Sequence, residues 1–565
     1  MRPLRGEEQG LLARSHDDAP ASPLLSPAHE DGPAEPLIKT GVEGAPAWNH
    51  MSSQQRTLVY VTFGLLGMGV LLPFNSLITP AEYFRSSFAR TPYANTFSSW
   101  ITVSYNVISI LVGIHATATG GFERSSPRRR ITLSSTAIIL SVFCFALSTR
   151  IGESTSRTGH HDDAPPSAAH SNTYFYFTLL LGGLLSSACA YLQNSVVSLS
   201  TAFGGGGTFM GSMLAGQGVV GVGISIFGFA SAWSQQAVRD DPASAVDEAA
   251  QETSRSIAHA ATLFFGMNTI LMMVVLAAFL WLTNTPLYAQ VMAKQIATID
   301  KIQDEHDDND DDDDLEDGVG SREHPMVQSW HSIRSISHPA YTSVLQKVPG
   351  FYRLSPATRE SLLRIALVQS KVKWDCAAVA FVFVVTLSIF PALTSAVQSV
   401  YTGTSRSSSL DLTSPQLFVP FHFFLFNLSD LLGRTLPSVV PASLIRRARA
   451  LVSLSLLRAL FVPLFMACNV VSTSQRTGPI GAAAAEGWLA RLVQSSDAPF
   501  FALMLLLGFS NGLVSTCIMI SGPSRSKLVN SKGASEGPLA ATLLSFWLCV
   551  GLAVGSGLSF LTVKA

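Results

Sequence analysis

Long runs of apolar residues recur along most of the 565-residue chain, separated by shorter polar stretches. A helix rises 1.5 Å per residue, so a run of about 20 residues crosses a hydrocarbon core about 30 Å thick. Because lipid offers no hydrogen bonds to the backbone, such runs in a membrane have to be helical. The pattern predicts an all-α integral membrane protein with eleven transmembrane helices, over residues 56–79, 93–116, 130–149, 173–200, 207–233, 260–283, 373–398, 415–440, 450–471, 498–521 and 537–561.

A long polar stretch after the sixth helix divides the predicted helices into a 6+5 arrangement. It contains the acidic run Asp304–Gly318, which repels itself and favours an extended, solvated linker. A calcium site is the alternative, but the run lacks the glycine-centred spacing of an EF-hand. The predicted parts are a disordered cytosolic tail (1–55), transmembrane helices 1–6 (56–283), a cytosolic acidic loop (284–372), transmembrane helices 7–11 (373–561) and a non-cytosolic tail (562–565).

Composition and charge agree with a membrane protein and argue against a nucleic-acid partner. Hydrophobic residues make up 47% of the chain and charged residues 13%, about half of the roughly 25% typical of soluble domains. The net charge is -1, so no basic surface for nucleic acid is expected. Arginine and lysine concentrate in the loops after the second, eighth and tenth predicted helices. The positive-inside rule then places these loops and the amino terminus in the cytosol.

Charged residues in the eighth predicted helix are the best pointers to function. A charge at mid-bilayer costs about 2.5–3.5 kcal/mol on insertion scales, so it has to face protein or a water-filled cavity. Asp430 and Arg434 are four residues apart, and Asn427 and Phe423 lie on the same helical face. This face could be a structural ion pair that locks two helices together. It could instead line a cavity and bind a polyhydroxylated solute, because a carboxylate accepts and a guanidinium donates hydrogen bonds.

Other polar and special residues in the apolar runs are more ambiguous. Gln193, at the centre of the fourth predicted helix, could bind a ring with donors and acceptors or could join a neighbouring helix. Asn75 follows Pro73, and prolines that kink membrane helices often lie near cavities. Pro391 occupies a comparable place in the seventh helix, which suggests a repeat of two halves. For Arg458 we expect structural contacts.

Enzymatic and cofactor-dependent functions find no support in the motifs. The segment from Gly216 to Gly221, GQGVVG, matches the dinucleotide fingerprint, but no strand precedes it. The predicted membrane core holds no converging nucleophile, base or metal ligands. The six cysteines fall in apolar runs without the spacing of a zinc site. We therefore expect a protein that is not an enzyme and that has no cofactor and no metal.

Six segments together resemble the equilibrative nucleoside transporter family. The resemblance covers nearly the whole helical part of the chain, and the helix count and the large central loop agree with it. The segments are LLPFNSLITPAEYF from Leu71, LAGQGVVG from Leu214, IFPAL from Ile389, FNLSDLLGR from Phe426, LLRALFVPLFMACN from Leu456 and GFSNGLVSTCIMISGPS from Gly508.

The resemblance implies a bundle like that of the major facilitator fold, which carries nucleosides, and as a further option nucleobases, by alternating access. It implies that Asp430 and Arg434 hold the ribose hydroxyls and that Gln193 contacts the base. It also implies that Gly216 and Gly221 allow neighbouring helices to pack closely. The residues that would line the cavity are Leu71, Phe74, Asn75 and Ile78 in the first helix and Phe423 and Asn427 in the eighth. A proton-coupled nucleoside transporter and a carrier of another polar solute, such as a sugar, are the alternatives.

The amino-terminal tail carries a candidate sorting signal. Glu7 precedes the pair Leu11 and Leu12 by four residues, as in an acidic dileucine pattern. Such a pattern in the cytosol would bind a sorting adaptor. It favours a vacuolar or lysosomal membrane over the plasma membrane, and the other partners we expect are nucleosides and the lipid bilayer.

Overall fold

The computed structural model describes most of the predicted helical part of the chain. Two regions with predictions lie outside the described residues: the amino-terminal tail to residue 45, with Glu7, Leu11 and Leu12, and the acidic run Asp304–Gly318. The described residues are 46–88, 91–93, 96–118, 126–157, 168–204, 207–239, 246–297, 356–401, 412–438, 447–468, 496–528 and 535–564.

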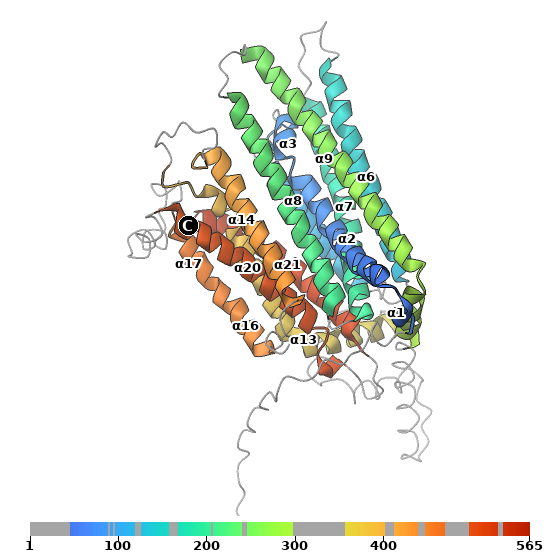
Figure 1. Ribbon diagram of the computed structural model, residues 1–565. Coiled ribbons are helices and arrows are strands. Elements are labelled where there is room, and N and C mark those ends of the chain that lie inside the picture. Colours follow the sequence, from blue (N-terminus) through green and yellow to red (C-terminus); the bar gives the residue numbers. More distant parts are fainter. Residues whose placement is uncertain are drawn as a thin grey trace, which may run out of the picture. The chain divides into compact units, whose positions relative to one another are not determined.

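The regular elements of these residues are α-helices and short 3-10 turns, which confirms the all-α prediction (Figure 1). The 3-10 turns are η6 (Thr394–Ala396), η7 (Leu436–Ser438), η8 (Arg458–Leu460) and η9 (Ser526–Leu528). The labelled α-helices are α1 (Pro46–His50), α2 (Ser53–Ile78), α3 (Ala81–Ser87), α4 (Phe97–Ala118), α6 (Pro127–Arg157), α7 (Ala168–Phe203), α8 (Thr208–Arg239), α9 (Val246–Thr283), α13 (Pro356–Ile389), α14 (Pro415–Thr435), α16 (Ala448–Leu457), α17 (Phe461–Met466), α20 (Asp497–Ser521) and α21 (Gly537–Lys564). Residues 286–297 are also helical.

Nine helical segments in the described part of the chain are long and apolar enough to cross a membrane. Two of the eleven predicted helices are not among them. The apolar part of α4, Trp100–His115, is shorter than a full span, and α14 contains Asp430 and Arg434. The nine segments are Ser53–Ile78, Pro127–Thr149, Ser171–Phe203, Thr208–Trp233, Ile257–Thr283, Ser361–Ala396, Ala448–Met466, Asp497–Ser521 and Gly537–Ser559.

Local sequence explains where several helices begin and break. Ser52 and Gln55 form a capping box at the start of α2, since each side chain accepts a hydrogen bond from the backbone N–H of the other. The ninth predicted helix is not continuous: it consists of α16, the turn η8 and α17. Pro463 lies just after this turn, and its nitrogen cannot donate to the carbonyl of Ala459.

Helices of the same half pack closely. In the amino-terminal half α2 packs on α8 and α9, and α6 on α7 and α9; in the carboxyl-terminal half α13 packs on α21, and α14 on α20. The contact between α2 and α8 joins backbone to backbone, because a Cβ atom on Gly216 would lie 1.9 Å from the carbonyl oxygen of Gly64. Only glycine fits at such a position.

The halves meet mainly where α8 contacts α14 (Figure 1) and where α21 contacts α7 and α4, with a smaller contact between α8 and α20. Large apolar side chains such as Leu140, Leu180, Leu263 and Ile270 are exposed on α6, α7 and α9. Such surfaces are stable in lipid and costly in water. Together with the nine apolar segments, they identify a multi-pass membrane protein.

Candidate functional site

The most concentrated buried charge in the described residues lies on α14. Asp430 and Arg434 are 6% and 7% exposed, and the Nε of Arg434 donates to the Oδ2 of Asp430 at 2.7 Å. Residues four apart lie one above the other on a helix, so the spacing itself brings the two groups together. The pair predicted from the sequence is therefore formed, and both members are removed from the surface.

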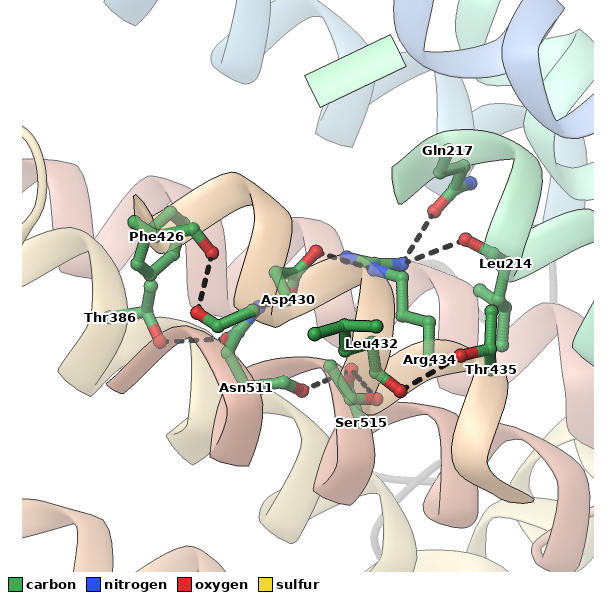
Figure 2. A network of polar contacts seen from close by, with 12 residues as sticks. Leu214, Gln217, Thr386, Phe426, Asp430, Leu432, Arg434, Thr435, Asn511 and Ser515 are labelled. Carbon is green, nitrogen blue, oxygen red and sulfur yellow. Dashed lines mark hydrogen bonds and ion pairs between the residues drawn. The ribbon is translucent and has the colours of Figure 1, made fainter. Parts of the chain in front are cut away.

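The second oxygen of the Asp430 carboxylate is held by another helix. Asn511 on α20 donates from its Nδ2 to the Oδ1 of Asp430 at 2.7 Å (Figure 2). The two helices approach closely here because a Cβ atom on Gly512, the next residue of α20, would lie 2.0 Å from the carbonyl oxygen of Asp430. The carboxylate thus accepts hydrogen bonds from two helices and has a fixed orientation.

A chain of polar contacts extends from Asn511 to Arg458. The hydroxyl of Thr386 on α13 lies 2.8 Å from the Oδ1 of Asn511. Arg458 donates from its Nη2 to the same hydroxyl at 2.5 Å, and from its Nη1 to the carbonyl of Leu507 at 3.2 Å and to the hydroxyl of Ser510. Arg458 is 2% exposed and lies at the break between α16 and α17. The structural contacts expected for Arg458 therefore lead directly to the Asp430 site.

This network contains two guanidinium groups and one carboxylate. Arg434 and Arg458 carry positive charges, and Asp430 carries the negative one. Buried charges are tolerated when they are paired and hydrogen-bonded, and each of these three groups has at least two hydrogen bonds. The network therefore carries a net positive charge, and such a charge attracts groups that accept hydrogen bonds.

Arg434 also connects α14 to the other half of the protein. Its Nη1 donates to the side-chain oxygen of Gln217 at 3.2 Å and to the carbonyl of Leu214 at 3.5 Å, both on α8 (Figure 2). Its Nη2 makes no hydrogen bond to the described residues, so the guanidinium keeps donors for a further partner.

Asn427 makes a second connection to α8. It donates to the hydroxyl of Ser225 at 2.7 Å rather than to Asp430. A Cβ atom on Gly221 would lie 2.6 Å from the side-chain oxygen of Asn427, so the absence of a side chain there makes room for the amide. The half-buried Phe423, one turn earlier, packs against Phe390 with 4.7 Å between ring centroids. The next residue, Pro391, follows the end of α13.

Gln193 belongs to a separate polar centre between the halves. Its amide on α7 donates to the hydroxyl of Ser545 at 2.9 Å and approaches the sulfur of Cys549 at 3.8 Å, both on α21. No hydrogen bond in the described part of the chain joins this centre to Asp430. The structure therefore places the two predicted polar contacts at different helix pairs, α7 with α21 and α8 with α14.

The predicted residues of the first transmembrane helix lie on α2 and are half-buried. Asn75 donates to the carbonyl of Leu71 in its own helix at 3.0 Å. Phe74 packs against Tyr105 of α4 with 4.9 Å between ring centroids. Within the described residues, neither these side chains nor Ile78 make a hydrogen bond or ring contact with Asp430 or Arg434.

Several residues of the site were not identified from the sequence. Asn511 and Gln217 both stand in segments that carried the family resemblance, and each is a lone amide in an apolar helix. A lone amide in an apolar helix is the signal that identified Gln193, and it could have identified these two residues as well. Thr386, Ser225 and Ser545 had no such signal, because hydroxyl groups are common in membrane helices, where they usually bond the preceding turn. In the described part of the chain no cluster of three potential metal ligands occurs.

Comparison with known proteins identifies the family. The sequence profile of the family described as "Nucleoside transporter" matches residues 179–564, which is more than half of the chain.

Curated relatives match over shorter segments. Equilibrative nucleoside transporter 1 of Mus musculus is 36% identical over 190 residues, 33% of this chain and 35% of the relative. Equilibrative nucleoside transporter 2 of Homo sapiens is 37% identical over 187 residues, 32% of this chain and 33% of the relative. Equilibrative nucleotide transporter 8 of Arabidopsis thaliana is 30% identical over 201 residues, which are 36% of this chain and 42% of the relative. The match thus spans about a third to two fifths of each relative.

Solved structures with a similar chain trace belong to the major facilitator superfamily. The proton:xylose symporter XylE, bound to 6-bromo-6-deoxy-D-glucose, has a TM-score of 0.47 and 12% identity over 91% of this chain and 95% of its own. FucP in the outward conformation has a TM-score of 0.35 and 11% identity over 88% of this chain and 97% of its own. Both scores lie below 0.5 and are too low to establish a shared fold.

Proposed function

The chain belongs to the nucleoside transporter family, and from that premise we propose that it carries nucleosides across a membrane by facilitated diffusion. The observation that supports this most directly is the buried Asp430–Arg434 pair at the junction of α8, α14 and α20. The two halves would alternate between states that open the site to either side.

The chemistry of the pair suits a ribose. A ribose presents two neighbouring hydroxyls, each of which both donates and accepts hydrogen bonds. The Asp430 carboxylate has lone pairs beyond the two that Arg434 and Asn511 use, and the Nη2 of Arg434 has donors to offer. The pair can therefore accept from one hydroxyl and donate to the other, while Asn511 and Gln217 hold it in position.

A nucleobase would be bound by the other polar centre and by α2. Gln193 offers an amide that matches the polar edge of a base, and it already joins α7 to α21 through Ser545. Phe74, Leu71 and Ile78 are half-buried and would provide apolar contact with the flat face of the base. On the α14 side, Phe423 and Asn427 would complete the cavity.

We propose eleven transmembrane helices in two groups of six and five. Nine of these helices are the apolar segments described above. The tenth is α4, whose apolar part is Trp100–His115, and the eleventh is α14, whose polar residues would face the cavity. The amino terminus would lie in the cytosol, as the basic loops indicate. Under this topology α14 crosses the membrane with its charged pair facing protein, where burial of Asp430 and Arg434 is tolerated.

The proposed location is a vacuolar or lysosomal membrane. Glu7, Leu11 and Leu12 would bind a sorting adaptor in the cytosol. A Leu11→Ala, Leu12→Ala variant should then shift to the plasma membrane, which imaging of a fluorescent fusion would detect. An unchanged location in the double variant would refute the sorting role.

Flux of several solutes into proteoliposomes tests the transport proposal. Uridine and adenosine should enter protein-containing vesicles faster than empty ones, unlabelled nucleosides should compete, and xylose should not. Uptake should not depend on a pH gradient if transport is facilitative. Saturable xylose uptake without nucleoside uptake would contradict the proposed substrate, and pH-driven accumulation of uridine would favour the proton-coupled alternative.

The site assignment has its own test. Asp430→Asn and Arg434→Ala each remove a hydrogen bond to a charged group, worth about 1.5–3 kcal/mol, so uptake should fall roughly 10- to 150-fold. Thr435→Ala is the matched control, since Thr435 is exposed and bonds only the carbonyl of Leu432 in its own helix. Normal uptake by both charge variants would show that the pair does not bind the solute.

A further inference from the structure

A second group of charges lies in the carboxyl-terminal half, where the end of α20 and the start of α21 meet the middle of α13. Asp375 on α13 accepts from the Nη2 of Arg525, just after α20, at 2.7 Å. Lys371 on α13 donates to Glu536, just before α21, at 2.8 Å. Residues of α13 therefore meet the connection between α20 and α21, which is distant from them in sequence. We call Lys371, Lys373, Arg525 and Lys527 the basic cluster.

Positive charge exceeds negative charge in this cluster. Its four basic side chains are accompanied by two carboxylates, Asp375 and Glu536, and each carboxylate already holds one cation. Lys373 and Lys527 are exposed and form no ion pair within the described residues. Two positive charges are therefore left without a partner carboxylate in the described part of the chain.

The pKa of Lys527 reflects this excess of positive charge. Partial desolvation lowers the pKa of Lys527 from its ordinary value; Asp375 opposes the change, whereas Arg525, Lys373 and Lys371 add to it. Several like charges thus lie close enough to repel one another. An anion bound among them would relieve the repulsion.

The position along the helices indicates what kind of anion could reach the cluster. Between Cys376 and Phe390, α13 contains no charged residue, so Lys371 and Lys373 stand where its apolar part begins. Trp374 is 64% exposed, and the Nζ of Lys373 lies 5.8 Å from its ring centroid. Exposed tryptophans beside lysines are typical of the depth of lipid headgroups.

We propose that the basic cluster binds the phosphate-bearing headgroup of an anionic phospholipid, with Lys373 and Lys527 as its main ligands and Trp374 beside the glycerol and upper acyl chain. Under the proposed topology this lipid lies in the cytosolic leaflet, where basic pockets at helix ends bind such headgroups. The site is separate from Asp430 and does not depend on which solute is carried.

The test uses the full-length protein purified in a neutral detergent. Dioctanoyl phosphatidic acid is added in increasing amounts and the midpoint of thermal unfolding is measured. The midpoint should rise to a plateau with phosphatidic acid and should not rise with dioctanoyl phosphatidylcholine. Inorganic phosphate at the same concentrations should also have no effect, because it lacks the acyl chains.

Charge-matched variants distinguish the cluster from general electrostatic attraction. Each lysine near a membrane surface contributes about 1 kcal/mol, or about fivefold in affinity, so Lys373→Gln with Lys527→Gln should raise the half-maximal lipid concentration roughly 25-fold. Lys373→Arg with Lys527→Arg should keep the wild-type response. Arg129→Gln with Lys294→Gln removes the same number of charges from exposed positions outside the cluster and should change nothing.

Three results would overturn the proposal. One is an unchanged half-maximal concentration in the Lys373→Gln, Lys527→Gln variant. Another is an equal shift with inorganic phosphate, which would indicate a site for free anions. The third is an equal shift with phosphatidylcholine, which would indicate acyl-chain binding alone. Unfolding midpoints without lipid, compared among all variants, verify that each one is folded.

Discussion

Asn511 on α20 holds the one oxygen of Asp430 that Arg434 leaves unoccupied, at 2.7 Å. The two contacts approach the carboxylate from different helices and together fix its plane. A carboxylate held by Arg434 alone could rotate about its last side-chain bond. Asn511 therefore acts on a solute through Asp430 and is a positioning residue in the proposed site.

Asn511→Ala should reduce nucleoside uptake about tenfold or more, because it removes a hydrogen bond to a charged group. The Michaelis constant should rise, since the ribose would meet a carboxylate in several orientations. Initial rates in proteoliposomes measure both effects. Ser515→Ala is the control: Ser515 lies one turn further along α20 and bonds only carbonyls of its own helix, those of Asn511 and Gly512. Equal kinetics for the two variants would contradict the positioning role.

Gly216→Ala should destabilise the protein strongly. The new methyl group would lie 1.9 Å from the carbonyl oxygen of Gly64, so α2 and α8 would have to separate. Gly223→Ala is the comparison, because nothing lies within 4 Å of a Cβ atom at that position of the same helix. There the exchange should be neutral or stabilising by about 0.5–1 kcal/mol. Thermal unfolding followed by size-exclusion chromatography would compare them, and equal midpoints would contradict the close packing.

His422→Leu should raise the unfolding midpoint. His422 on α14 is 0% exposed, lies among Phe418, Phe423 and Phe500, and neither ring nitrogen makes a well-formed hydrogen bond in the described residues. A buried polar group without a partner costs about 1–3 kcal/mol, which leucine would recover. His422→Gln keeps a polar group and should bring no gain. A lower midpoint for the leucine variant would mean that the imidazole has a partner, such as a bound water.

Ser225 and Asn427 should be energetically coupled. Their hydrogen bond joins α8 to α14 at 2.7 Å. Thermal unfolding of Ser225→Ala, Asn427→Ala and the double variant should give a coupling energy of about 0.5–1.5 kcal/mol. A second cycle with Asn427→Ala and Thr435→Ala has no such contact and should be additive. Additivity in both cycles would show that the contact contributes nothing to stability.

Periodicity predicted the part of the site that lies on one helix. Asp430 and Arg434 were expected on one face of the eighth predicted helix, and the structure pairs them at 2.7 Å. Asn427 was expected on that face too, yet it bonds Ser225 on α8. Helical spacing defines a face, but it does not say which helix lies opposite.

Partners on other helices could not be derived from one sequence. Asn511 reaches Asp430 only because α20 packs on α14, and Gln217 reaches Arg434 only because α8 lies on the other side. The predicted ends of the helices were also inaccurate. The apolar pattern of the seventh predicted helix begins at 373, whereas α13 begins at Pro356. Hydropathy marks the segment that suits lipid, and a helix can continue beyond it.

The two sides of α8 differ in how they are held. Toward α2 its backbone touches a neighbouring backbone at Gly216, and these atoms cannot separate without disrupting the half to which both helices belong. Toward α14 the side-chain contacts include the hydrogen bonds of Gln217 and Ser225, which a solute or water can replace one at a time. In the proposed transport cycle, the contact between α8 and α14 would be the seam along which the halves separate, and the residues that would bind a ribose lie on it. A solute that exchanges hydrogen bonds with Arg434 would loosen that seam as it binds.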